Sequence, residues 1–232
     1  MRTASAFDAT GAFRCELAGY IASAAFTSGH RFVVGIWHES PLGPMADVMW
    51  SRPGGQRVLL VDRPAVGELI TAVYRFDAVE QMPLVARVEG DSVKVSAGDL
   101  VLELRGGREW PIPLARLRGR PMGRRAEAPV ARWLLGVRTF GTSPTGVDEW
   151  YRSDRYRRVV DGRATLAGQD LGSICRFRGP TGFGFSEPPR RPAVVRVRPL
   201  LVDTGGALEG VLTACRERDR AGSLPDDGPG RS

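Results

Sequence analysis

The stretch WHESPLGP places a carboxylate where a strand is expected to give way to a rigid turn. His30–Trp37 is rich in β-branched and aromatic residues, and Ser40–Pro44 contains two prolines and a glycine. Glu39 lies between these two segments. A glutamate buried among apolar side chains acquires a raised pKa suited to general acid/base catalysis. Glu39 is therefore the first candidate catalytic residue, and the alternative is an exposed loop carboxylate or one paired with arginine.

Cysteine and histidine usage predicts neither a metal centre nor a disulfide framework. Cys15, Cys175 and Cys215 are far apart and odd in number, and no Cys or His pair has the spacing of zinc ligands. We expect free thiols, no metal and no cofactor. No apolar run approaches the ~20 residues that cross a bilayer, and residues 1–13 lack the apolar region of a secretory signal. A cytoplasmic protein without membrane contact is expected.

The formal net charge of +7 raises the question of nucleic-acid binding. A basic segment lies between positions 116 and 132, but arginine is spread over the whole chain. Only one of the 33 basic residues, Lys94, is a lysine, a bias typical of genome composition. No pattern of a helix-turn-helix, RRM or zinc finger is present. Nucleic-acid binding remains a third and weaker hypothesis.

The elements that would position these residues are mostly short strands. Besides His30–Trp37, β-branched runs and two-residue alternation predict strands over 46–50, 57–61, 84–88, 92–95, 100–104, 149–156, 162–171, 181–185 and 193–198. Helical spacing of apolar residues predicts a helix over 64–74, capped by Asp62. A second short helix is predicted over 207–218. Lys94 alternates with valines, so its side chain is expected on the solvent face.

These elements predict a mainly β (α+β) fold with few helices. The tight turns at 89–91 and 97–99 make an antiparallel meander of the strands between 84 and 104. Residues 105–129 are interpreted as a long excursion, and residues 130–140 as a buried segment. We expect a single domain over 1–220, built on a large curved antiparallel sheet or barrel, and a disordered tail over 221–232.

The order of these motifs resembles the acetoacetate decarboxylase family. The resemblance rests on the Glu-Ser stretch followed by a Gly/Pro turn, the helix VGELITAVYRF and the meander PLVARVEGDSVKVSAGDLVLELRGG. It covers roughly residues 30 to 107, and the later segment RGPTGFGFSEPPRRP extends it weakly over 176–203. It implies a barrel with an active-site cavity.

The resemblance also implies roles for individual residues. Glu39 falls on the family's active-site glutamate, which would point into the cavity. The Schiff-base lysine should lie at the end of the 64–74 helix, where this chain has Tyr74 and Arg75. Both are candidates for binding a carboxylate or an enolate oxygen, although they could simply end the helix. Arg14 is a candidate counterpart of the family's active-site arginine.

The absence of a lysine at that position changes the expected chemistry. Decarboxylation through an iminium needs a poised amine, and a guanidinium stays protonated. We therefore expect a barrel that binds a keto-acid-like or hydrophobic metabolite, with lyase- or isomerase-type proton transfer by Glu39 if there is turnover. The alternative is a non-catalytic structural or interaction protein whose barrel is packed with side chains. The sequence leaves homo-oligomer formation open.

Overall fold

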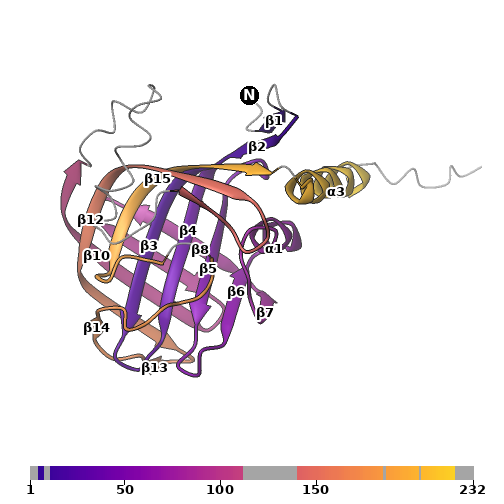
Figure 1. The fold of residues 1–232 in the computed structure, drawn as a ribbon. Helices are drawn as coiled ribbons and strands as arrows, with labels where there is room; N and C mark the ends of the chain where they lie inside the picture. Colours follow the sequence, from indigo (N-terminus) through magenta and orange to yellow (C-terminus); the bar gives the residue numbers. More distant parts are fainter. Residues whose placement is uncertain (1–4, 8–10, 112–139, 185–186, 204, 223–232) are drawn as a thin grey trace, which may run out of the picture.

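The computed structural model describes residues 5–7, 11–111, 140–184, 187–203 and 205–222. This part of the chain contains fifteen strands and two helices (Figure 1). The strands are β1 (Ser5–Phe7), β2 (Phe13–Glu16), β3 (Ala18–Phe26), β4 (Arg31–Glu39), β5 (Met45–Ser51), β6 (Arg57–Val61), β7 (Ala78–Gln81), β8 (Leu84–Glu89), β9 (Ser92–Ala97), β10 (Leu100–Pro111), β11 (Phe140–Thr142), β12 (Asp148–Leu166), β13 (Gln169–Asp170), β14 (Ile174–Cys175) and β15 (Ala193–Asp203). The helices are α1 (Pro64–Thr71) and α3 (Ala207–Gly222).

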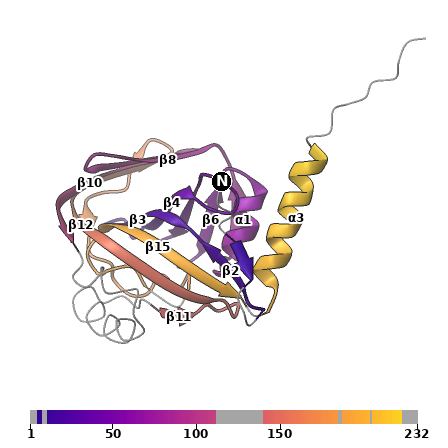
Figure 2. The ribbon, with the colours of Figure 1, turned by 90° about the horizontal axis from the view of Figure 1, so that it is seen from above.

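All the described strands belong to one curled sheet. Its main path runs β7-β6-β5-β4-β3-β15-β12-β10-β9-β8. Every pairing on this path is antiparallel except that of β6 with β7, which are parallel and connected through α1. Figure 2 shows the curl: β8 and β10 form one wall, β12 and β15 the opposite wall, and both helices lie at one side. The predicted mainly β fold on a large curved antiparallel sheet with few helices is confirmed.

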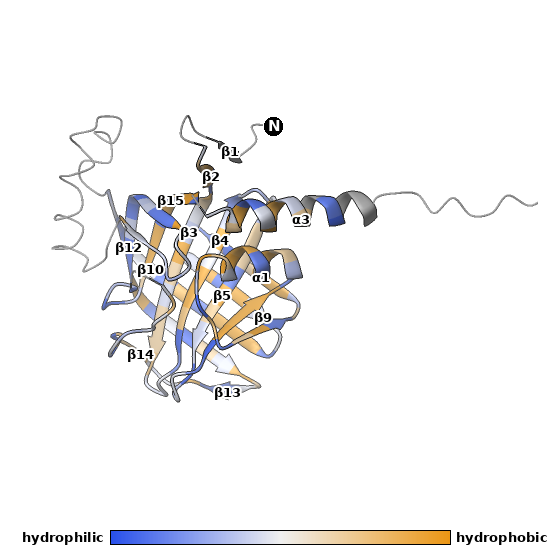
Figure 3. Ribbon diagram, turned by 45° about the vertical axis from the view of Figure 1, so that its right-hand side comes forward, coloured by the Kyte–Doolittle hydropathy of each residue, from blue (hydrophilic) through white to orange (hydrophobic). Residues whose placement is uncertain are grey.

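The two faces of the central strands pack into two separate cores. We call the first the inner cluster; it lies between β3–β6 and β8–β10 and contains Phe26, Phe32, Val34, Val48, Trp50, Val95 and Leu102. The second, the helix-side cluster, lies between the other face of the same strands and the helices, and contains Trp37, Met49, Leu59, Leu69, Ile70, Val197, Leu201, Leu208 and Leu212. Strands buried on both faces have nearly continuous apolar sequences, and Figure 3 shows apolar residues along the middle strands.

Helix α1 packs its predicted apolar face on the sheet. Val66, Leu69 and Ile70 are buried in the helix-side cluster. The helix ends at Thr71, and the three residues after it form a turn in which Val73 and Tyr74 donate backbone hydrogen bonds to the Ile70 carbonyl. The prediction of Asp62 as the N-cap is wrong. Arg63 occupies that position without a side-chain cap bond, and Asp62 forms an ion pair with Arg63 instead.

Other element boundaries differ from those predicted. The strand expected over 149–156 and the first part of the one expected over 162–171 belong to one long strand, β12, because a bulge between Ser153 and Arg155 lets it bend without ending. After a turn, Gln169–Asp170 form β13. No strand forms over the described residues 181–184, since Gly182 has a φ of 72°. Residues 105–111 extend β10. The rest of the predicted excursion, and all of the predicted buried segment except Phe140, lie outside the described residues.

The turns of the meander form as predicted. Gly90 and Gly98 connect β8 to β9 and β9 to β10 with φ values of 61° and 53°, a conformation that glycine adopts without a steric penalty. Helix α3 continues beyond the predicted limit to Gly222. The extent of the domain remains a prediction, and the predicted tail lies outside the described residues except for the end of this helix.

Candidate functional site

A cavity of about 150 Å³ opens in the helix-side core. Its walls come from the helix-side face of β3, β4 and β5, the adjoining parts of β12 and β15, the end of α1, and residues 181, 183 and 187–189. Most of the lining is apolar: Leu17, Ile21, Val33, Met49, Leu69, Ile70, Val73, Phe183, Val195, Val197 and Leu201. The acidic and phenolic lining residues are Asp47, Tyr74, Tyr151 and Glu187, and none of the described residues lining the cavity is Lys, Arg or His.

A cluster of three side chains lies at the cavity wall. Tyr74 and Tyr151 both line the cavity, and both donate hydrogen bonds to Glu149 Oε2, at 2.6 and 3.2 Å. The two hydroxyl groups also contact each other. Glu149 is completely buried, and its Oε1 has no hydrogen-bond partner in the described part of the chain. We call these residues the tyrosine–glutamate cluster.

The backbone explains how residues that are 75 positions apart meet. Glu149 and Tyr151 lie on one face of β12 because they are two residues apart. Tyr74 follows α1, where the Arg75 amide donates to the Phe183 carbonyl and anchors the turn. Gly184 packs against the Tyr74 ring: a Cβ there would lie 2.6 Å from the ring. Glycine at this position therefore leaves room for Tyr74.

Burial dominates the electrostatics of the tyrosine–glutamate cluster. Loss of solvation raises the pKa of Glu149 to about 7, although the bonds from the two tyrosines oppose this rise. Burial also raises the pKa of Tyr74 and that of Tyr151 well above the ordinary value, and the neighbouring Glu149 adds to the effect. The Glu149 carboxyl group therefore changes its protonation state near neutral pH.

Asp47 is a second buried acid, and it lines the cavity. It lies on β5 directly opposite Gly35 of β4 and is 0% exposed. Trp37 Nε1 donates to Asp47 Oδ1 at 2.9 Å. A Cβ on residue 35 would lie 2.3 Å from that oxygen and 2.5 Å from the indole nitrogen, so Gly35 leaves the space in which the pair meets. Burial raises the pKa of Asp47 to about 6, and the bond from Trp37 partly offsets this.

Glu187 lines the cavity too, but both of its oxygen atoms are occupied. Oε2 accepts hydrogen bonds from the Thr181 amide and hydroxyl, each at 2.6 Å, and Oε1 accepts one from the Gly182 amide at 3.0 Å. These bonds tie Glu187 to Thr181 and Gly182 at the cavity wall. Glu187 is therefore a structural carboxylate.

The structure places Glu39 outside this cavity. Its side chain is 58% exposed and lies 3.8 Å from Arg198. The expectation that it points inward is wrong for a local reason. Ala18 and Gly19 of β3 pair with Glu39 and Trp37, so His38 is an extra residue in a bulge. A bulge interrupts the alternation of faces, and only Trp37 keeps its orientation toward the core. A catalytic role for Glu39 stays a prediction.

The other predicted site residues are not brought together either. Tyr74 lines the cavity. Arg75 is exposed and donates to the Pro144 carbonyl at 2.9 Å, away from the cavity. Arg14 is an exposed residue of β2, in register with Val202 of β15. Lys94 is exposed on β9 and paired with Glu89 at 2.8 Å, so the predicted solvent orientation is confirmed.

Sequence reasoning missed Asp47 and Glu149. Each lies in a segment that was predicted as a strand, and each interrupts an otherwise apolar face. In Met45–Ser51, Asp47 shares its face with Met45 and Met49, and all three are buried. An acid within such a strand was the available signal.

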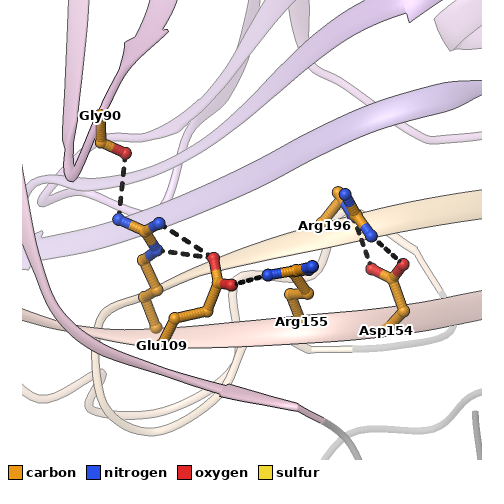
Figure 4. Close-up of polar contacts among 6 residues, drawn as sticks. Gly90, Glu109, Asp154, Arg155 and Arg196 are labelled. Atoms are coloured by element: carbon orange, nitrogen blue, oxygen red, sulfur yellow. Dashed lines mark hydrogen bonds and ion pairs between the residues drawn. The ribbon is translucent and has the colours of Figure 1, made fainter.

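Arginines of β12 and β15 are largely neutralised by acids (Figure 4). Glu109 of β10 pairs with Arg155 and Arg157, and Arg157 also donates to the Gly90 carbonyl at 3.0 Å. Asp154, the bulged residue of β12, pairs with Arg196. These pairs give no support to a phosphate-binding surface. The basic segment 116–132, on which nucleic-acid binding was considered, lies outside the described residues.

The described ranges contain neither a metal-binding cluster nor a membrane-spanning helix. No group of three or more His, Cys, Asp or Glu side chains there could hold a metal ion. None of the described helices has the length and apolar character needed to span a membrane. Cys15, Cys175 and Cys215, all within the described ranges, form no disulfide bond.

We expect Gly35→Ala to destabilise the protein by about 2–4 kcal/mol, because a methyl group would separate Trp37 from Asp47 in a packed core. Chemical denaturation and the fluorescence of Trp37 measure the effect. Gly54→Ala is the matched control, since nothing lies within 4 Å of a Cβ there. Equal stability of the two variants would contradict the packing described.

The raised pKa of Glu149 predicts a pH dependence of stability. Because the folded-state pKa (about 7) exceeds the ordinary value of 4.5, this group stabilises the fold fully below about pH 4.5, and its contribution is lost as pH rises through about 7. Glu149→Gln removes this titration. Its stability relative to wild type should therefore rise by roughly 3 kcal/mol between these pH values, as measured by denaturation.

The exposed Glu217→Gln, on α3, serves as the control for that titration. It should follow the wild-type pH profile throughout. A Glu149→Gln profile parallel to wild type would show that Glu149 titrates normally.

Comparison with known proteins gave two distant structural likenesses. The structure is similar to acetoacetate decarboxylase from Legionella pneumophila, with a TM-score of 0.38 and 10% identity over 88% of each chain. It is also similar to an AttH-like protein from Nitrosomonas europaea, with a TM-score of 0.30 and 13% identity, over 82% of this chain and 51% of that one. No protein-family model and no curated protein sequence matches the chain. Both likenesses concern the overall course of the chain.

Proposed function

We propose that this protein binds a small hydrophobic metabolite in the helix-side cavity. The observation that supports it is a cavity of about 150 Å³ with mainly apolar walls and two phenol groups. Apolar cavities of about this volume take up ligands of the size of benzene. Burial of a ligand there would proceed without displacing any of the packed inner cluster.

Of the two ligand classes predicted from the sequence, the hydrophobic class fits this cavity better. A keto acid would bring a carboxylate next to Asp47, where the described lining offers no Lys, Arg or His to neutralise it. Burying an anion without a partner costs several kcal/mol. Arg75 and Arg14, the predicted anion-binding residues, lie away from the cavity.

The tyrosine–glutamate cluster would give this site acid/base chemistry without a lysine. In the proposed step the Glu149 carboxylate takes the proton that Tyr74 donates to it, as the Tyr74 oxygen removes a proton from the carbon next to the ligand's carbonyl group. The electron pair of that C–H bond passes to the carbonyl oxygen, which takes a proton from the Tyr151 hydroxyl, and the reverse transfers restore the cluster. Such proton transfer is typical of isomerases and lyases. The competing hypothesis is a non-catalytic protein, for which the solid packing of the inner cluster is the favourable observation.

Toluene binding tests the first part of the proposal. Toluene should raise the melting temperature of wild type, since a ligand that binds only the folded state stabilises it. Val33→Phe should abolish the rise by filling the cavity that Val33 lines. Val85→Phe places the same ring at an exposed position of β8 and should keep the full rise. Equal shifts in all three proteins would mean that toluene does not enter this cavity.

Deuterium exchange into cyclohexanone tests the proton-transfer step. In heavy water we expect wild type to catalyse exchange at the carbon next to the carbonyl, as followed by NMR. Tyr74→Phe and Glu149→Gln should each slow the exchange by about 100-fold, the usual scale of general acid/base catalysis. Tyr156→Phe, a partly buried tyrosine that does not line the cavity, is the control. Toluene binding without any exchange would support the non-catalytic alternative.

A further inference from the structure

Asp47 Oδ2 is a buried acceptor that has no donor. The oxygen is inaccessible to solvent and has no hydrogen-bond partner in the described part of the chain. The other oxygen of the same carboxyl group is engaged by Trp37 at 2.9 Å. Buried polar groups nearly always have partners, and one left without costs about 1–3 kcal/mol. The residue lines the cavity, so a bound ligand is the available source of a donor.

Neither of the other two carboxyl groups near the cavity combines an unpartnered oxygen with a place in the cavity lining. Both oxygen atoms of Glu187 accept bonds from its own loop. Glu149 also has one unpartnered oxygen, but the residue is not part of the cavity lining and lies behind Tyr74 and Tyr151. Asp47 is thus the acid that both lines the cavity and has an unpartnered oxygen among the described residues.

The surroundings of Asp47 determine which donor fits. Besides Asp47, the described lining contains one acid, Glu187, and two phenols, Tyr74 and Tyr151, and no cationic side chain there competes for Asp47. An ammonium group would satisfy Oδ2 with a charge-assisted hydrogen bond, which is about twice as strong as a neutral one. It would also neutralise the carboxylate, so that neither charge is buried alone. A carboxylate head group would be repelled at the same place.

We propose that the helix-side cavity selects a small apolar amine, whose ammonium group binds Asp47 while its hydrocarbon part fills the space between α1 and the sheet. This assignment rests on the proposed function, because it names the ligand class of the same cavity. The volume of about 150 Å³ suits one six-membered ring with a short side arm. Trp37 and Gly35 act as positioning residues that fix the carboxyl group on β5.

Four probes that differ only in the group attached to the ring test the assignment: benzylamine, benzyl alcohol, benzoate and toluene. Calorimetric titration near neutral pH should give wild-type binding of benzylamine at least about tenfold tighter than of benzyl alcohol, the scale of one charged hydrogen bond. Benzoate should not bind. Asp47→Asn keeps the acceptor for Trp37, and it should remove the preference for the amine while leaving toluene binding unchanged.

Asp99→Asn, at an exposed turn between β9 and β10, is the matched control and should keep the wild-type preference. Equal affinities for benzylamine and benzyl alcohol, or a preference that survives Asp47→Asn, would overturn the amine assignment and leave the hydrophobic-ligand function standing. Failure of all four probes to bind wild type would overturn both.

Discussion

The main physical constraint on this structure is the burial of two carboxyl groups in an apolar core. Glu149 and Asp47 are both 0% exposed, and neither has an ion-pair partner among the described residues. Each is held instead by neutral donors: two phenols for Glu149 and one indole for Asp47. Neutral donors stabilise a carboxylate less than a cation does. Burial therefore outweighs these bonds and raises the pKa of Glu149 to about 7 and that of Asp47 to about 6.

The sheet separates these buried acids from a second, fully apolar core, because its two faces pack into different clusters. The inner cluster is filled by large apolar side chains such as Phe26, Phe32 and Leu102, and it provides hydrophobic stabilisation independent of the site. The polar groups are confined to the opposite face of the same strands. Alternation along β4 illustrates the division: Phe32 and Val34 enter the inner cluster, whereas Val33 and Trp37 face the helices.

Much of the fold was predictable because it follows from local periodicity. The strands at β4, β5 and β6, the turns at Gly90 and Gly98, and the apolar face of α1 were all indicated by residue patterns. The bends were less predictable. The bulge at His38 depends on the register of β4 with β3, and the bulge at Asp154 on the register of β12 with β15. β15 is distant from β12 in the sequence. The outward orientation of Glu39 follows from the bulge at His38, and the spacing of residues within β4 alone does not predict it.

The site was predictable only in part, for the same reason. Tyr74 was identified through the resemblance of its helix to a known motif, but its partner Glu149 lies 75 residues away. Asp47 is recognisable once β4 and β5 are in register, because Gly35 then stands opposite it and leaves room for Trp37. Glycine in a strand is a weak signal alone. Its meaning here comes from the residue across the ladder.

With a phenol and no amine at position 74, the chemistry of the tyrosine–glutamate cluster is limited to proton movement and hydrogen bonding. An amine can form a covalent iminium with a carbonyl group, whereas a tyrosine whose pKa is raised by burial stays protonated and can only donate or relay a proton. None of the described residues that line the cavity is a lysine, so the protein supplies no amine there. In a cavity lined by Asp47 and lacking a described cation, a positively charged nitrogen is the group that a ligand can most favourably supply.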